Sequence, residues 1–368
     1  MKIKALALIS GGLDSLLAAK LIFDQGCEVI GLHFKIPFCK INIKKSFPDI
    51  GIKIIEVDLG QEFLKLIQAP HYGFGSNMNP CIDCKILMFS RAKELMPELE
   101  AKFIITGEVL GQRPMSQNKQ ALKLIKRKSG LDDLLLRPLS AKFFPESVAE
   151  RQGWVKRDEL LDLNGRKRTA QMRLAEELHI TKYANPAGGC LLTDPCFSKR
   201  LKELFAHKEL DLDNLELLKI GRHFRISKNT RFVVGRNEFE NNQLTQLAKP
   251  GDYLFHAQND LAGPISLSRG LVDFELLALC AQITAAYSDT AEISAIDVFY
   301  RHLPAALAMA LPTGRQTMSL CPTGSQTTVL QPVALATGSQ TTVLQPALEE
   351  KKHKTLCVPK SNFAHLLI

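Results

Sequence analysis

Three cysteines stand at spacings that suit sulfur chemistry. Cys81 and Cys84 form a CxxC pair in "NPCIDCK", and Cys190 follows about a hundred residues later in "NPAGGCLLTD". Thiolate is the reactive form of cysteine, and a neighbouring helix N-terminus or lysine lowers the thiol pKa. Cys84 is followed by Lys85 and by residues with helical spacing, so the sequence predicts a reactive thiol at this position.

A second stretch, "LALISGGLDSLLAAK", suits phosphate binding. A glycine turn between a buried strand and a helix directs several backbone N–H groups and a helix N-terminus at one point. Gly11 and Gly12 would let phosphate oxygens approach the main chain, while Ser10 and Ser15 add hydroxyl donors. Asp14 would either cap the helix or share a Mg²⁺ ion with the phosphates. The turn matches neither the GxxxxGK[ST] nor the GxGxxG pattern.

The elements around these residues alternate between apolar strands and helices as far as about residue 205. We expect strands at Ile3–Ile9, Cys27–Phe34, Ile52–Leu59 and Lys102–Glu108, and helices at 13–26, 84–96 and 166–178. Buried strands that alternate with helices are typical of a parallel sheet covered on both faces. The predicted fold is therefore α/β with a doubly wound parallel sheet over residues 1–205.

The pattern of apolar and polar residues changes after residue 205. Short alternating strands and turns predict a small α+β domain over residues 206–290. Residues 291–368 are expected to be a mostly disordered tail, because "TGSQTTVLQP" occurs twice, at Thr323–Pro332 and Thr337–Pro346, with a degenerate third copy before them. Such polar ten-residue units are too short to stack as a solenoid.

The bulk composition narrows the class of protein. Nine cysteines, an odd number in a long chain, argue against a disulfide framework and for reduced thiols. No apolar run approaches the roughly 18–20 residues that span a bilayer, so we expect a cytoplasmic protein without a membrane partner. The net charge of +9 leans mildly towards polyanionic partners. The oligomeric state is not predicted.

The segment "SGGLDS" resembles the SGGxDS signature of the PP-loop ATP pyrophosphatases, over about residues 1–200. The resemblance implies an adenine nucleotide alpha hydrolase-like fold in which Ser10, Gly11, Gly12, Asp14 and Ser15 hold the pyrophosphate of ATP. It also implies that the end of the second strand, with His33 and Phe34, approaches adenine. Thr106 and Gly107 in "TGEVLGQRP" would flank the nucleotide, and Glu108 stands where many relatives have histidine.

SGGxDS, NPCxxC and a late Gly-Gly-Cys together are similar to tRNA thiolation enzymes, the 2-thiouridylases and, less closely, the 4-thiouridine synthases. The resemblance implies a tRNA sulfurtransferase that adenylates a uridine oxygen with ATP and replaces it with sulfur from a donor protein or sulfide. In one variant Cys190 carries a persulfide and Cys84 resolves it. In the other, Cys81, Cys84 and Cys190 hold a [4Fe–4S] cluster with one open iron. A zinc site with Cys196 stays an alternative.

Residues Lys219–Gly270 resemble the RNA-binding domain of the NFACT proteins, through "VGRNEFEN", "GDYLFHAQND" and "GPISL". The resemblance implies contact with tRNA. Arg222, Arg225, Arg236 and His256 are interleaved with aromatic residues, a combination that suits phosphate contacts and base stacking. We therefore name these four residues as candidate RNA contacts.

Two other functions remain open at this level. An adenylating enzyme with a nitrogen nucleophile would need no thiols, and a non-enzymatic RNA- or ribosome-binding factor would only sense ATP. Arg137 in "LLLRPLS" is a further candidate contact for phosphate or substrate. The other cysteines carry no spacing signal and are interpreted as core or incidental residues: Cys27, Cys39, Cys280, Cys321 and Cys357.

Overall fold

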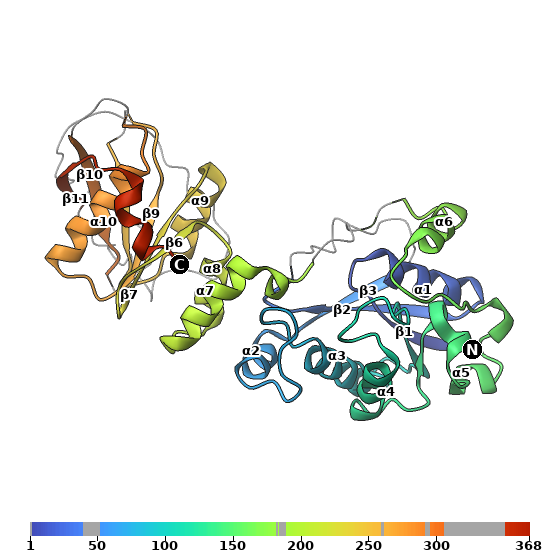
Figure 1. Ribbon diagram of the computed structural model, residues 1–368. Coiled ribbons are helices and arrows are strands. Elements are labelled where there is room, and N and C mark those ends of the chain that lie inside the picture. Colours follow the sequence, from blue (N-terminus) through green and yellow to red (C-terminus); the bar gives the residue numbers. More distant parts are fainter. Residues whose placement is uncertain are drawn as a thin grey trace, which may run out of the picture. The chain divides into compact units, whose positions relative to one another are not determined.

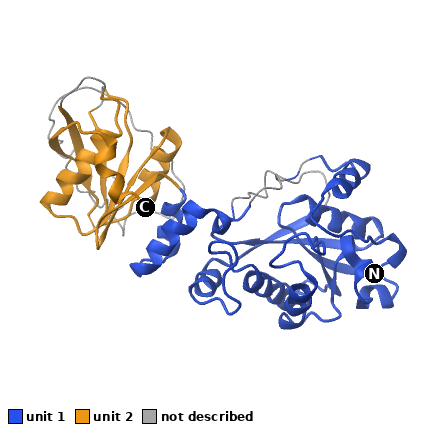
Figure 2. Cartoon of the chain, in the orientation of Figure 1, with its two compact units in different colours: residues 1–219 blue, residues 220–368 orange. Residues whose placement is uncertain are grey.

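The computed structural model describes residues 2–39, 52–181, 183, 189–258, 261–290, 295–304 and 350–368. The chain divides into two compact units, residues 1–219 and 220–368 (Figure 2). The repeats at Thr323–Pro332 and Thr337–Pro346, and Cys321, lie outside the described residues. Each unit has its own sheet and its own apolar core.

The sheet of the first unit is parallel throughout. It consists of β1 (Lys4–Leu8), β2 (Glu28–Lys35), β3 (Lys53–Asp58), β4 (Phe103–Thr106) and β5 (Leu135–Leu136) in the order β3-β2-β1-β4-β5. The strand order reverses between β1 and β4, and ligands of open α/β sheets bind outside the carboxyl ends of the strands at this switch point. The predicted phosphate turn follows β1, and the predicted Thr106–Gly107 segment ends β4.

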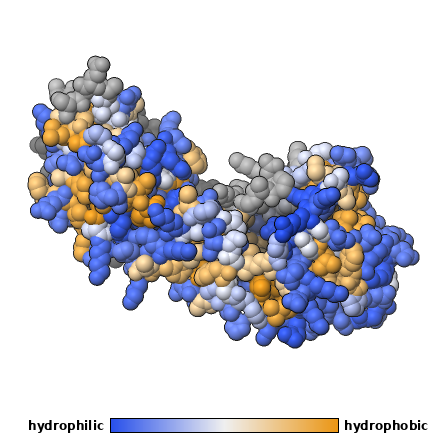
Figure 3. Space-filling model, viewed as in Figure 1, coloured by the Kyte–Doolittle hydropathy of each residue, from blue (hydrophilic) through white to orange (hydrophobic). Residues whose placement is uncertain are grey.

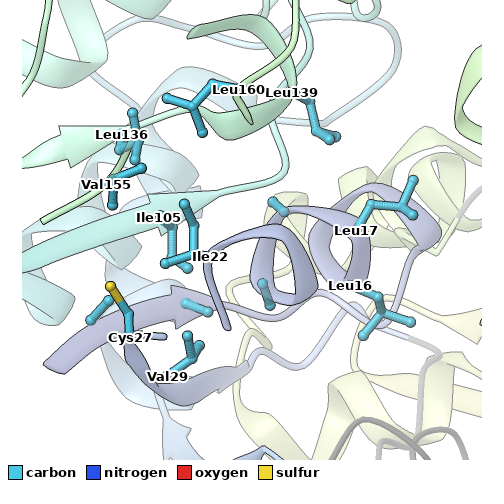
Figure 4. Close-up of a cluster of buried hydrophobic side chains, with 14 of the residues drawn as sticks. Leu16, Leu17, Ile22, Cys27, Val29, Ile105, Leu136, Leu139, Val155 and Leu160 are labelled. Atoms are coloured by element: carbon cyan, nitrogen blue, oxygen red, sulfur yellow. The ribbon is translucent and has the colours of Figure 1, made fainter. Parts of the chain in front are cut away.

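Helices cover both faces of this sheet, as the apolar strand sequences predict (Figure 1). One face packs against α1 (Leu13–Asp24), α5 (Val148–Arg151) and α6 (Thr169–Glu177), and Figure 4 shows part of this core around Leu16, Leu17 and Ile105. The other face packs against α3 (Cys81–Leu95) and α4 (Lys119–Lys128). The doubly wound α/β prediction is therefore confirmed.

The first unit contains further helical elements. They are α2 (Gly60–Gln68), α7 (Pro195–Ala206), α8 (Leu212–Leu218) and the short 3-10 helices η2 (Pro138–Phe143), η3 (Arg157–Glu159) and η4 (Leu191–Thr193). An apolar cluster joins α2, α7, α8 and the loop after β2 through Phe38, Phe63 and Phe197. This cluster brings the segment around residue 190 against the segment that follows β2.

The second unit contains an antiparallel sheet with the strand order β11-β10-β8-β9-β7-β6. Its elements are β6 (Arg222–Ser227), β7 (Thr230–Val234), α9 (Glu238–Leu247), β8 (Tyr253–Ala257), β9 (Ser266–Gly270), α10 (Phe274–Ala286), β10 (Ala295–His302), β11 (Glu350–Leu356) and η6 (Lys360–Leu366). One face of the sheet packs on α10 through Phe224, Phe232 and Phe255, which are almost fully buried.

This division differs from the domain bounds expected from the sequence, 1–205, 206–290 and 291–368. Helix α8 belongs to the first unit, where Leu215 and Leu218 join the cluster around Phe38. Strands β10 and β11 lie in the stretch expected to be a tail, yet β10 pairs in register with both β8 and β11. The sheet of the second unit therefore includes residues from both sides of the repeats.

The visible surface of the chain is mostly hydrophilic, with apolar residues in patches (Figure 3). Among the described residues, no helix is both long and apolar enough to cross a bilayer.

Candidate functional site

The predicted phosphate turn lies at the carboxyl end of β1. Gly11 has a φ of 83°, which a side chain rarely adopts, and Gly12 precedes the first residue of α1. Ser15 Oγ donates to the Gly12 carbonyl oxygen at 2.7 Å and fixes the turn from within. The Gly12 N–H has only a long contact, 3.4 Å, to Ser10 Oγ, and Ser10 is exposed. The turn therefore presents a backbone donor and a hydroxyl at the start of a helix.

The loop after β4 packs against this turn without space for a side chain. A Cβ on Gly107 would lie 2.4 Å from the carbonyl carbon and oxygen of Asp14 and from the Ser15 nitrogen. Real Cβ atoms do not approach backbone this closely, so the contact requires glycine. Thr106, directly before it, is buried. The structure thus brings the turn and the Thr106–Gly107 segment together, as expected from the sequence.

Asp14 does not cap α1, which has no side-chain cap. Gln112 Nε2 donates to Asp14 Oδ2 at 3.0 Å, and the Arg168 guanidinium lies 3.5 Å from Oδ1. Oδ1 accepts no hydrogen bond from the part of the chain that the structure describes. Sequence reasoning missed Gln112 and Arg168. The basic run "RKRTAQMR" was the available signal for Arg168.

His33 and Phe34 are buried at the end of β2. The His33 Nδ1 atom lies 3.0 Å from the Ile9 carbonyl oxygen, next to the turn, so the imidazole holds the ends of β1 and β2 together. Their suggested part in adenine binding stays a prediction.

A buried ion network connects the loop after β4 with the helix of the CxxC pair. Glu108 Oε1 accepts from Lys85 Nζ at 2.6 Å, and Glu108 Oε2 accepts from Arg137 Nε at 2.8 Å. Burial alone would raise the pKa of Glu108, but the charges of Lys85 and Arg137 outweigh it and lower that pKa. Arg137 is only 4% exposed, so it positions Glu108 rather than presenting its charge at the surface.

Four cysteines approach one another near this network. Cys81 and Cys84 lie one turn apart on α3, and their thiols interact electrostatically with that of Cys190. Cys39 also belongs to this set, because it faces Cys190 in an isolated antiparallel β-bridge. The sequence interpretation of Cys39 as a core or incidental residue did not foresee this contact, since the tertiary fold brings the two segments together.

The expectation of a lowered thiol pKa at Cys84 is also wrong. Burial raises the pKa of Cys84 far above its ordinary range, and the neighbouring cysteines Cys190 and Cys81 add to this shift. The charge of Lys85 opposes the shift, but Lys85 is engaged with Glu108. Burial also raises the pKa of Cys190 to about 11 and raises that of Cys81. All three thiols are therefore held protonated at neutral pH.

A metal ion is held by a group of His, Cys, Asp or Glu side chains. The described residues contain no group of three or more His, Cys, Asp and Glu side chains arranged to hold a metal ion. The three cysteines expected to hold a [4Fe–4S] cluster approach one another without that arrangement, so we derive no step through a cluster.

The candidate RNA contacts of the second unit divide between the two faces of its sheet. Arg222 lies on the α10 face, where its guanidinium is 4.9 Å from the Tyr287 ring. Arg225 lies on the opposite face of the same strand, and His256 lies on that face of β8. Arg236 follows β7 and forms an ion pair with Glu240.

The face opposite α10 carries further cations that sequence reasoning missed. Residues from β8, β10 and β11 share it, and we call them the open face: His256, Phe299, Arg301, Lys352 and Lys354. Two acidic residues also lie there: His256 Nε2 is 2.9 Å from Glu350, and Lys352 pairs with Asp297 at 2.6 Å. The His256 and Phe299 rings stack, with centroids 5.6 Å apart. These lysines follow the repeats, in a polar stretch that the sequence predicts to be part of the disordered tail.

The first unit is an α/β domain with a glycine turn at the switch point of its parallel sheet. Residues 1–142 match the family described as thiamine biosynthesis protein (ThiI), and residues 221–311 match the NFACT protein RNA binding domain. The chain thus combines a segment that matches the ThiI family with a segment that matches the NFACT RNA-binding domain, which confirms the combination expected from the sequence.

Similar proteins include a probable tRNA sulfurtransferase of Methanothermobacter thermautotrophicus, 28% identical over 160 residues, which are 41% of this chain and 40% of that protein. The tRNA-specific 2-thiouridylase MnmA of Syntrophotalea carbinolica is 32% identical over 117 residues, 28% of this chain and 33% of that protein. The chain therefore spans two fifths or less of the length of these relatives. A crystal structure of a 4-thiouridine synthetase–RNA complex with bound ATP aligns with a TM-score of 0.33 and 19% identity, covering 59% of this chain and 52% of that chain.

Proposed function

We propose that the chain is an ATP-dependent tRNA sulfurtransferase that adenylates a carbonyl oxygen of a uridine and replaces it with sulfur. The observation that carries the proposal is the connection between two sites within the first unit. The phosphate turn touches the loop of Gly107, and the next residue, Glu108, binds Lys85 beside Cys84. A group activated at the turn and a sulfur nucleophile held by the cysteines would thus share one edge of the sheet.

The residues of the turn suggest how the first step is supported. The Gly12 N–H and the Ser10 hydroxyl would bind the departing pyrophosphate, where negative charge accumulates as the uridine oxygen attacks the α-phosphorus. Asp14 would hold Mg²⁺ through Oδ1, which accepts no hydrogen bond among the described residues. The ion would supply charge neutralisation to the phosphates. Arg168 is then free to turn from Asp14 towards the same phosphates.

For the second step we propose the persulfide variant, in which the outer sulfur atom and not the cysteine Sγ attacks the base. Loading this sulfur requires the thiolate of the cysteine, so the raised pKa of Cys190 makes the loading step slow at neutral pH. In this proposal Cys190 carries the sulfur. Its outer sulfur attacks the activated carbon of the base, and AMP leaves with the former carbonyl oxygen.

The experiment is nucleoside mass spectrometry of tRNA from a deletion strain complemented with wild type, Cys190→Ser or Cys196→Ser. Loss of one thionucleoside, restored by wild type and by Cys196→Ser but not by Cys190→Ser, supports the proposal. Cys196 is a matched control because it is exposed and lies on the neighbouring helix α7. Unchanged thionucleosides in the deletion strain would contradict it.

The second unit would bring the tRNA to this chemistry. The open face combines the cations Arg301, Lys352 and Lys354 with a stacked His256–Phe299 pair. Cations bind phosphates without reading sequence, and aromatic rings stack on unpaired bases. Because Arg236, His256 and Lys352 already have acidic partners, we expect Lys354 of β11 to contribute more to RNA affinity than these three residues.

A further inference from the structure

Cys39 and Cys190 occupy a register that suits a reversible disulfide bond. They face each other in an isolated antiparallel bridge, and the Leu191 N–H donates to the Phe38 carbonyl oxygen at 2.9 Å. The hydrogen bond therefore joins the flanking residues, so the two cysteines form a non-hydrogen-bonded pair. Such pairs have Cα atoms about 4.5 Å apart. A disulfide needs a Cα separation of about 4.4–6.8 Å, so it can form here with little movement of the backbone.

The position of this cysteine pair is consistent with a role in the proposed sulfur transfer. Cys39 follows β2 at the carboxyl edge of the parallel sheet, the edge that carries the phosphate turn. Cys39 and Cys190 are both half-buried, and Cys39 interacts electrostatically with Cys84 as well. Phe38 and Leu191, which flank the pair, are anchored in the apolar cluster that joins α2, α7 and α8. The two backbone segments are therefore held in register by packing.

We propose that Cys39, rather than Cys84, is the thiol that resolves the intermediate on Cys190. The inference rests on the persulfide form of the proposed function. After the outer sulfur of the Cys190 persulfide has bonded to the base and AMP has left, the base is joined to Cys190 through an S–S bond. Cys39 Sγ attacks Cys190 Sγ, and that S–S bond breaks.

The electrons and protons balance in this step. The thiolated base leaves with the electron pair and takes up the proton lost by Cys39, while Cys39 and Cys190 are oxidised together to a disulfide. A dithiol reductant then supplies two electrons and two protons and restores both thiols. The sulfane sulfur enters from a persulfide or polysulfide donor.

The first test measures pairing without turnover. The full chain is treated with stoichiometric diamide, which accepts two electrons from two thiols, and its disulfide-linked peptides are identified by mass spectrometry. The proposal expects a Cys39–Cys190 peptide in wild type and in Cys196→Ser. Cys39→Ser should lose this peptide. A predominant Cys84–Cys190 or Cys81–Cys84 linkage in wild type would overturn the inference.

The second test follows a single turnover with sodium polysulfide, ATP and unmodified tRNA transcript, without a reductant. Wild type should release thiolated tRNA and end with the Cys39–Cys190 disulfide. Cys39→Ser should retain the tRNA as a covalent adduct on Cys190 that dithiothreitol releases. Release of thiolated tRNA by Cys39→Ser at the wild-type rate would overturn the inference and leave the proposed function standing. A diamide-induced Cys39–Cys190 disulfide without any thiolated tRNA in wild type would instead contradict the proposed function.

Discussion

The two sheets of the molecule carry their candidate sites in different ways. The parallel sheet of the first unit is covered on both faces, so its polar residues gather where strands end, at Ser10–Ser15 and Thr106–Glu108. The antiparallel sheet of the second unit buries one face under α10. On the other face Val233, Leu254 and Leu267 are also buried, and the cations lie along β10 and β11. A site at strand ends depends on backbone geometry and on single glycines. A site on a strand face depends on alternation, and each side chain contributes a small share.

The largest effect is expected from Gly107→Ala. The added methyl group would lie 2.4 Å from the backbone of Asp14 and Ser15, so the loop or the turn must move. We expect loss of ATP-dependent pyrophosphate release and a clearly lowered midpoint of urea unfolding. Gly12→Ala is the matched variant, because its Cβ would meet only Ser10 Oγ at 3.6 Å and its φ is −83°. It should keep the stability of wild type while ATP binding weakens. Equal unfolding midpoints for Gly107→Ala and wild type would contradict the close contact.

The next prediction compares how much the buried ion network and an exposed ion pair contribute to stability. Glu108→Gln leaves Lys85 and Arg137 buried without their counter-charge, and we expect it to lower the free energy of unfolding by about 3 kcal/mol. Glu159→Gln, which breaks the exposed Lys156–Glu159 pair, should cost less than about 1 kcal/mol. Urea unfolding at pH 7 measures both. Similar losses in the two variants would refute the distinction.

The same network predicts how stability depends on pH. The folded state lowers the pKa of Glu108, so its contribution is present above the pKa of the unfolded state, near the ordinary 4.5. It is lost as the pH falls through the lower pKa of the folded state. Glu108→Gln should therefore flatten the acid limb of the stability curve.

A moderate effect concerns the reactivity of the thiols. Because burial raises the pKa of Cys190 to about 11, its alkylation by iodoacetamide should keep accelerating above pH 9, where an ordinary thiol levels off. Quantitative mass spectrometry of the Cys190 peptide, with glutathione in the same tube, measures this. A plateau at the same pH as that of glutathione would show that the thiol is exposed to solvent, and a plateau at lower pH would show that it is paired with a cation.

The smallest effects are expected on the open face. Lys354→Ala should weaken tRNA binding modestly and reduce the slope of log affinity against log salt by about 1. Lys351→Ala is the matched control, because Lys351 is exposed on the same strand but alternates to the other face of the sheet. Filter binding between 50 and 200 mM salt, a range that resolves about one phosphate contact, separates the two variants. Equal salt slopes for the two variants would argue against RNA binding at the open face.

The sequence predicted the elements with strong local signals. Helix α1 (Leu13–Asp24), α3 (Cys81–Leu95) and the strands β1 to β4 agree with the expected ranges within a few residues. The turn at Gly11 was visible because its glycines and its position after a strand have a direct physical cause. Strand β5 was missed because Leu135–Leu136 is too short to show a period.

Contacts between distant segments left no local signal. Cys39 and Cys190 meet only because Phe38 and Leu191 share an apolar cluster, and Arg168 reaches Asp14 only through the packing of α6 on α1. The pKa of Cys84 was misjudged for the same reason, since the fold buries this thiol beside Cys190 and the burial outweighs the charge of Lys85. Strand β11 was missed because the repeats separate it from its partner β10.

The position of β11 after the repeats has an evolutionary consequence. Residues 303–349 connect two strands whose ends are fixed side by side, and the repeated units lie within this connection. The entropy lost on closing a loop grows only with the logarithm of its length, so one more ten-residue unit would cost about 0.2 kcal/mol. Copies can therefore be gained or deleted by slippage of the coding repeat while β11 still pairs with β10. The number of copies is then nearly neutral to selection for folding.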